Sequence, residues 1–164
     1  MLKKIIAVVA LALSASSTFA ADKPSFYAGL DAGSTKVDDL SGRKSSFGGF
    51  AGYQFTNGLA IEGGYRKLAS FSVYKTDVDL TQSALSLVGT TEIGNGFDLL
   101  GRVGYNKLSA SASYKGFSGK ASDSGVLFGL GVAYNFSSTL STRLEIQRPS
   151  KDATNVSVGV ALKF

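Results

Sequence analysis

Apolar and polar side chains alternate along the last eleven residues of the chain, 154–164. One face of this segment carries large apolar side chains, and the residues between them are small or polar. The apolar positions are Val156, Val158, Val160, Leu162 and Phe164. A period of two predicts a β-strand, and about ten alternating residues are enough for a tilted strand to cross a bilayer. We therefore expect a membrane-crossing strand here.

Seven more segments alternate in the same way. They predict strands over 26–34, 46–55, 59–67, 79–91, 97–107, 124–136 and 140–148. The pattern is weakest in 79–91, where we expect Leu85 and Leu87 to face outward. The connections alternate between short turns, such as Asn57-Gly58, and longer segments at 35–45, 68–78, 108–123 and 149–153. This organisation predicts an all-β fold, an eight-stranded antiparallel transmembrane β-barrel with short periplasmic turns and four longer extracellular loops.

Ionised residues on the opposite face decide between two kinds of barrel. A soluble barrel of the lipocalin type would bury its apolar face around a ligand, but here the polar face carries three acids and three bases. They are Asp31, Glu62, Arg66, Arg102, Arg143 and Glu145. Because buried charges must be paired, we expect a lumenal charge network in a plugged polar lumen, with the apolar face toward lipid. The network either simply fills the lumen and fixes the register or gates a small pore.

Aromatic residues gather at the ends of the predicted strands that meet the short turns. They are Tyr53, Phe55, Phe97, Tyr134, Phe136 and Phe164. Aromatic side chains are enriched where a barrel wall crosses the membrane interface. We expect these six to form the periplasmic aromatic girdle.

The N-terminus has the features of an export signal. Lys3 and Lys4 precede an apolar run at 5–13, and small residues lead to Ala20. This pattern predicts a cleaved secretory signal peptide over 1–20, the alternative being an amphipathic helix of the mature fold. Residues 21–164 then form one outer-membrane barrel domain, located in the cell outer membrane.

Three stretches resemble a known family. Residues 142–147 with the final strand resemble the closing hairpin of the OmpA transmembrane domain, and 61–65 and 97–104 resemble its third and fifth strands. Small barrels of the neisserial surface protein A type are equally good relatives. In such proteins the last strand and its terminal aromatic residue serve as the assembly signal. The resemblance thus implies that role for Val160, Leu162 and Phe164, with the barrel-assembly machinery as a partner during biogenesis.

The resemblance also suggests a gate, with two departures. In OmpA a lumenal arginine on the seventh strand pairs with carboxylates, and Arg143 and Glu62 occupy the positions of such a pair. The second carboxylate falls on Ala133, and the fourth-strand lysine has no counterpart near Val88 or Thr90. OmpA also carries a periplasmic peptidoglycan-binding domain. This sequence ends at Phe164, so we expect no such tether.

The composition argues against catalysis. The barrel enzymes of the outer membrane use a histidine as general base, and this chain has no histidine and no cysteine. We therefore expect no enzyme, no catalytic residue, no cofactor and no metal site. The formal charge is +5, or +3 once Lys3 and Lys4 are removed (5 − 2). That value is modest, and we expect a monomer with no nucleic-acid partner.

Basic residues collect at the predicted outer end. We expect contacts to lipopolysaccharide phosphates from Arg43, Lys44, Lys75, Lys115, Lys120 and Lys151. The alternative is ordinary solvated loop charge. Segment 109–117 is either a mobile or adhesive loop or a hairpin that extends above the membrane. The expected function is a surface protein with a structural or interaction role toward lipid, lipopolysaccharide or host surface molecules, the alternative being a minor ion channel gated by the lumenal network.

Overall fold

The computed structural model describes residues 24–37, 42–56, 58–73, 76–114 and 117–164. The side chains of 69–73, 76–78, 112–114, 117, 118 and 120 are outside this description. The predicted signal peptide also lies outside the described residues and stays a prediction.

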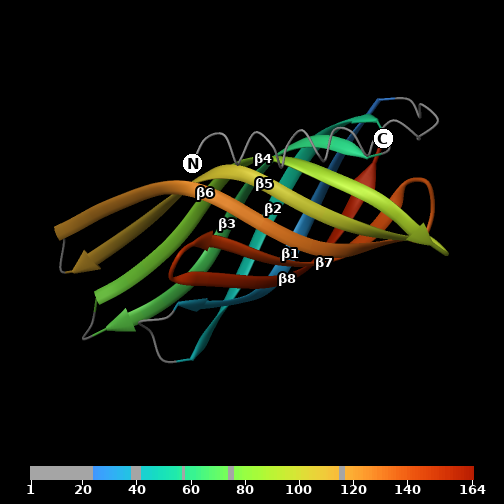
Figure 1. Cartoon of the computed structure of the whole chain (residues 1–164). Coiled ribbons are helices and arrows are strands. Elements are labelled where there is room, and N and C mark those ends of the chain that lie inside the picture. The colour runs from blue at the N-terminus through green and yellow to red at the C-terminus, as the bar shows by residue number, and fades with distance from the viewer. Residues whose placement is uncertain (1–23, 38–41, 57, 74–75, 115–116) are drawn as a thin grey trace.

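Eight antiparallel strands form a closed barrel in which sequence neighbours pair and β1 pairs with β8. The strands are β1 Ser25–Val37, β2 Arg43–Thr56, β3 Leu59–Val73, β4 Thr76–Gly94, β5 Phe97–Tyr114, β6 Phe117–Asn135, β7 Leu140–Ser150 and β8 Ala153–Lys163. Figure 1 shows β1, in blue, beside β8, in red, where the sheet closes. The predicted fold class is confirmed.

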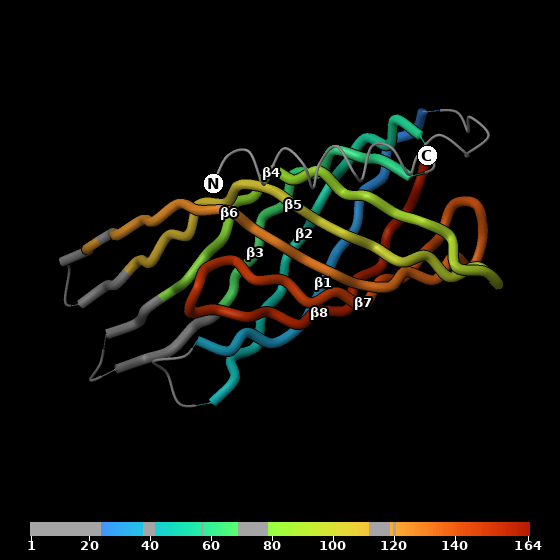
Figure 2. The backbone as a smooth tube through the Cα atoms, viewed as in Figure 1, coloured from blue at the N-terminus to red at the C-terminus, as the bar shows by residue number. Residues whose placement is uncertain are grey.

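The barrel has two distinct ends. The β2–β3, β4–β5 and β6–β7 connections lie at one end together with Phe164, and we name it the turn end. The opposite end, which carries the other four connections, is named the loop end. The turn end lies on the right in Figures 1 and 2. At the β4–β5 turn, positive φ values at Gly94, Asn95 and Gly96 reverse the chain tightly.

Residue parity divides the side chains between the outer wall and the lumen, as predicted. Leu30 is 74% exposed on the wall, whereas its neighbour Asp31 is 7% exposed inside. Leu85 and Leu87, from the weakest predicted strand, do face outward. An apolar outer wall around a polar interior is stable only when lipid surrounds it. Separately, no helix among the described residues is long and apolar enough to cross a membrane.

The predicted limits of the long loops are wrong. β3 continues to Val73 and β4 begins at Thr76, while β5 continues to Tyr114 and β6 begins at Phe117. Segments 68–78 and 108–123 are thus mostly hairpin, and 109–117 follows the second of its two predicted alternatives. The alternation fades there because both faces of an extension beyond the lipid meet water, while the backbone ladder continues.

Candidate functional site

A quartet of charged side chains crosses the middle of the lumen. Glu62 accepts hydrogen bonds from Arg102 Nη2 at 2.7 Å and from Arg143 Nη1 and Nη2 at 2.7 and 3.1 Å. Glu145 accepts from Arg102 Nε at 2.6 Å and lies 3.7 Å from Arg143 Nε. Tyr27 donates its hydroxyl to Glu62 at 2.9 Å. All four charged side chains are at least nine-tenths buried, so each charge depends on its partners rather than on water.

The sheet register explains how side chains from three strands meet. Arg102 on β5 is opposite Gly129 on β6, and Gly129 is opposite Gln147 on β7, two residues from Glu145 on the same face. A Cβ on Gly129 would lie 2.7 Å from Glu145 Oε1. The glycine therefore leaves the space through which Arg102 reaches Glu145. Arg143 also lies over the ring of Phe50, 3.5 Å from its centroid, in a cation–π contact.

The other two predicted lumenal charges form a separate pair nearer the loop end. Arg66 binds Asp31 through two hydrogen bonds of 2.8 and 2.7 Å, a bidentate geometry that is among the strongest available to arginine. Arg66 Nη1 also donates to Gln147 at 3.0 Å and to Asn155 at 3.2 Å. Asn155 in turn donates to Thr35 and Ser46. Our sequence reasoning missed these neutral partners, although their inward parity could have identified them.

Among the described residues, fully buried side chains occupy the lumen between the quartet and the loop end. Leu68, Leu127 and Pro149 are fully buried in this part, and Asn106 donates to the Pro149 carbonyl at 2.9 Å. A cavity lined by Leu127 and by charged residues of the quartet and of the Asp31–Arg66 pair has a volume of about 20 Å³, which is roughly the room for one water molecule.

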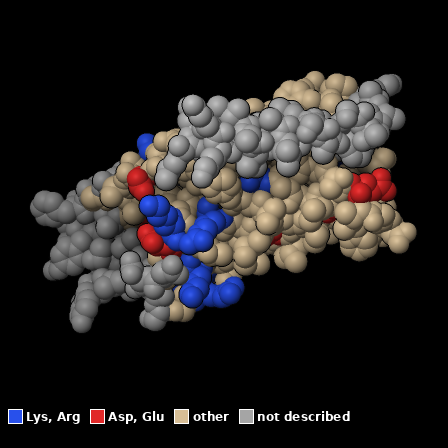
Figure 3. All heavy atoms as spheres, in the orientation of Figure 1, with Lys and Arg blue, Asp and Glu red and all other residues tan. Residues whose placement is uncertain are grey.

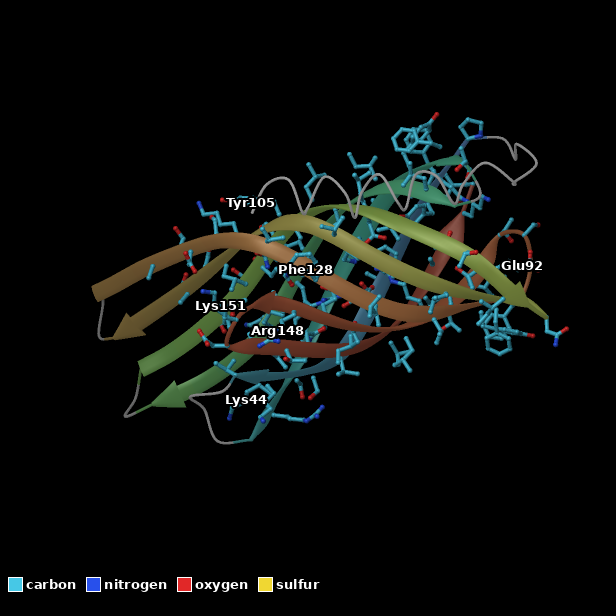
Figure 4. The ribbon with its side chains drawn as sticks, in the orientation of Figure 1. Lys44, Glu92, Tyr105, Phe128, Arg148 and Lys151 are labelled. Carbon is cyan, nitrogen blue, oxygen red and sulfur yellow. The ribbon has the colours of Figure 1, made fainter. Side chains whose placement is uncertain are left out.

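On the turn-end side of the quartet the lumen is open. A cavity of about 490 Å³ extends from the turn-end mouth inward to Tyr27 and Arg143. Ala133 and Val88 line it, and these are the positions where the OmpA resemblance would have placed a carboxylate and, nearby, a lysine. Short apolar side chains leave this volume empty. We name this space the cup, and Figure 4 labels Glu92 at the turn end of β4, beside its mouth.

The outer wall at the turn end carries the six aromatic residues expected in the girdle. Two clusters form there, with Tyr53 and Phe55 ring centroids 5.1 Å apart and Tyr134 within 4.9 Å of both Phe97 and Phe136. Phe26 packs against Tyr53 with ring centroids 4.9 Å apart and the rings tilted, and it was not among the six residues predicted for the girdle. Phe164 is 75% exposed and its backbone pairs with that of Phe26. Val160 and Leu162 also face outward.

Cations occupy the outer wall at the loop end. Lys36 on β1 and Arg43 on β2 are directly opposite each other and exposed. Lys151 is also exposed and its carbonyl accepts from Arg148 Nη2 at 2.8 Å. Figure 4 shows Arg148 and Lys151 together at the β7–β8 hairpin, and Figure 3 shows most of the visible Lys and Arg side chains in this half of the molecule.

The other four residues predicted to contact lipopolysaccharide are not seen on the exposed outer wall. Lys44 is half-buried and has lumenal parity, since its neighbours Arg43 and Ser45 are exposed. Lys75 and Lys115 lie outside the described residues, as does the side chain of Lys120. Within the described residues, no group of three or more histidine, cysteine or acidic side chains is placed to hold a metal ion.

A closed barrel with an apolar outer wall and an ionised lumen defines an integral membrane protein of the outer-membrane β-barrel class. Residues 5–164 match the family model described as outer membrane protein beta-barrel domain. The chain belongs to this family, and it is an outer-membrane protein of the OmpA-like kind.

Individual relatives agree with this assignment. The chain is 33% identical over 180 aligned residues to outer membrane protein P5 of Haemophilus influenzae, an alignment that covers 90% of this chain and 51% of P5. The chain thus spans about half the length of that relative. Among solved structures, neisserial surface protein A superposes with a TM-score of 0.71 at 20% identity, covering 87% of this chain and 100% of the other.

A second solved structure is Ail, the attachment invasion locus protein of Yersinia pestis, in complex with the heparin analogue sucrose octasulfate. It gives a TM-score of 0.61 at 20% identity and covers 86% of this chain and 97% of Ail. At this identity the two structural matches establish the fold alone.

Proposed function

We propose that this protein is a surface-interaction barrel whose loop-end cations bind the phosphate groups of lipopolysaccharide in the outer leaflet. The turn end then faces the periplasm. The observation that carries the proposal is the Lys36–Arg43 pair, in which two exposed cations are directly opposite each other in the β1–β2 register. Like charges in this position destabilise a sheet, whereas a phosphate between them would offset the repulsion with charge-assisted hydrogen bonds.

The height of these cations on the wall supports the same partner. On β2, Arg43 and Phe47 are on the same face, and Arg43 is four residues closer to the loop end. On β5, Lys107 and Tyr105 are on the same face, and Lys107 is two residues closer to the loop end. Phe47 and Tyr105 are 62% and 61% exposed, as expected for side chains in lipid. The cations therefore begin where the apolar belt ends, which is the level of lipid headgroups. Ail was solved with a polysulfated sugar analogue, and a binding site for a polyanion on this fold is consistent with our proposal.

The alternative of a gated ion channel is less well supported. Ion flow would require a path past the buried Leu68, Leu127 and Pro149 and through the small cavity beside the charge network, which holds about one water molecule. Opening the quartet alone would leave this part closed. The expected contacts with host molecules and the barrel-assembly machinery, the monomeric state and the absence of enzymatic activity stay predictions.

A binding titration tests the proposal. The refolded protein in phospholipid nanodiscs is titrated with lipopolysaccharide and with the same material after phosphate removal. Each cation near a lipid surface contributes about 1 kcal/mol, so K36Q/R43Q should lose roughly 2 kcal/mol, about thirtyfold in affinity. The matched control is Lys67→Gln, because Lys67 is already paired with Asp79 at 2.9 Å. Equal affinity of K36Q/R43Q and wild type, or an equal loss in the control, would reject the proposal.

A further inference from the structure

The cup is a blind cavity of the size of a small-molecule site. Its volume is about 490 Å³, within the range of ligand pockets, roughly 300–1,000 Å³. Arg143 borders both the cup and the small space beyond it, whose volume is only about 20 Å³. Arg143 and Tyr27 thus form a floor, and a molecule that enters from the turn end remains on that side.

One wall of the cup is apolar, although the rest of the lumen is mostly polar. Ala60, Val88 and Leu100 form a buried hydrophobic cluster on β3, β4 and β5, with Tyr27 packed against it. These four residues also line the cavity. A hydrocarbon body against this wall would remove from water the apolar surface that the wall still exposes to the cavity. The wall therefore selects a ligand with an apolar body.

The mouth beside this wall is acidic. Glu92 on β4 and Asp98 on β5 are directly opposite each other, and both line the cavity. Asp98 accepts a hydrogen bond from Asn135 at 2.9 Å. The one cation that lines the mouth among the described residues, Lys163, is on β8, away from this pair. At the floor, the charge of Arg143 is already matched by Glu62. The acidic mouth favours a cationic group on the ligand.

We propose that the cup is a binding site for a compact apolar amine, whose hydrocarbon body lies against Ala60, Val88 and Leu100 and whose ammonium group lies at Glu92 and Asp98. The ligand enters from the turn end, the side that the proposed orientation places in the periplasm. The site is at the opposite end of the barrel from the proposed phosphate-binding rim, so neither depends on the other.

Methyl NMR of the folded protein in nanodiscs provides the test. The probes are 1-aminoadamantane and adamantane-1-carboxylate, which share one hydrocarbon cage and differ in charge. We expect saturable shifts of the Val88 and Leu100 methyl groups with the amine. The Val158 methyl groups, which face lipid, should not show the same saturation and so report partition into the bilayer. Absence of saturable shifts at Val88 and Leu100 would overturn the proposal.

Two variants separate shape from charge. Ala133→Phe fills the cup and should abolish the saturable shifts, whereas Val132→Phe, one residue away on the lipid-facing wall, should bind as wild type does. E92Q/D98N, at the solvent-accessible mouth, should weaken amine binding about fivefold, the effect of partly exposed charges, and leave the carboxylate no weaker. Undiminished binding to Ala133→Phe would refute the cup as the site. Equal binding of the amine and the carboxylate to the wild type would refute the cationic ligand class.

Discussion

Replacing Glu62 with glutamine tests the role of the quartet in stability. The carboxylate is 2% exposed and accepts hydrogen bonds from Arg102, Arg143 and Tyr27. Glutamine has nearly the same shape, but it removes the charge and turns one acceptor into an NH2 donor that faces guanidinium donors. Two buried cations would then share Glu145 alone. Removing one partner from a buried ion pair costs about 3–5 kcal/mol, and we expect Glu62→Gln to lower the free energy of unfolding by that amount.

The assay is urea unfolding of the refolded barrel in lipid vesicles, with the gel mobility of unboiled samples reporting the folded fraction. Asp98→Asn is the control, because that carboxylate belongs to an exposed hydrogen bond with Asn135 and its loss should cost less than about 1 kcal/mol. Adding Arg143→Met to Glu62→Gln removes one unpaired cation, so the double variant should be more stable than the sum of the single effects predicts. If Glu62→Gln costs no more than Asp98→Asn, the quartet does not depend on its ion pairs for stability.

Three other predictions follow from closure, packing and the filled loop-end lumen. Because the chain contains no cysteine, a disulfide between two introduced cysteines can be assigned without ambiguity. Ala32 on β1 is directly opposite Val158 on β8, so A32C/V158C should form a disulfide under oxidation. A cysteine pair offset by four residues should not. Gly29→Ala should destabilise the barrel by about 1–3 kcal/mol, because a Cβ at this position would meet the Phe50 ring and the Val160 carbonyl. Gly63→Ala is the control and should be neutral, because a Cβ there would meet open space. Similar effects of the two substitutions on urea unfolding would contradict this packing. In planar bilayers neither wild type nor Arg143→Ala should conduct, and discrete current steps from either would show that the loop-end half opens.

The alternation of side chains predicted the strands and their faces because lipid and lumen impose opposite polarity on successive residues. Leu30 and Asp31 illustrate this, as does the outward position of Leu85. The ends of the hairpins were not predictable in this way. Residues 109–113 read Ser-Ala-Ser-Ala-Ser, and beyond the membrane nothing distinguishes the two faces, so the pattern carries no strand signal although the ladder continues.

The partners within the lumen also required the structure. Sequence parity placed Glu62, Arg102 and Glu145 inside, but their contact depends on Gly129 of the intervening strand β6, where a Cβ would lie 2.7 Å from Glu145 Oε1. The cup was missed for a related reason. A sequence shows that Ala133 is small, but only the geometry shows that no longer side chain from another strand fills the space beside it.

Cysteine labelling distinguishes the closely packed loop-end part of the lumen from the open cup. Ala161 and Ser157 both point inward from β8; Ala161 lines the cup, while Ser157 is 4% exposed near the charge network. In the folded, otherwise cysteine-free protein, a small water-soluble thiol reagent should modify Ala161→Cys readily and leave Ser157→Cys unmodified until the barrel is unfolded. Equal rates at the two positions would show that the lumen is not divided into a packed part and an open cup.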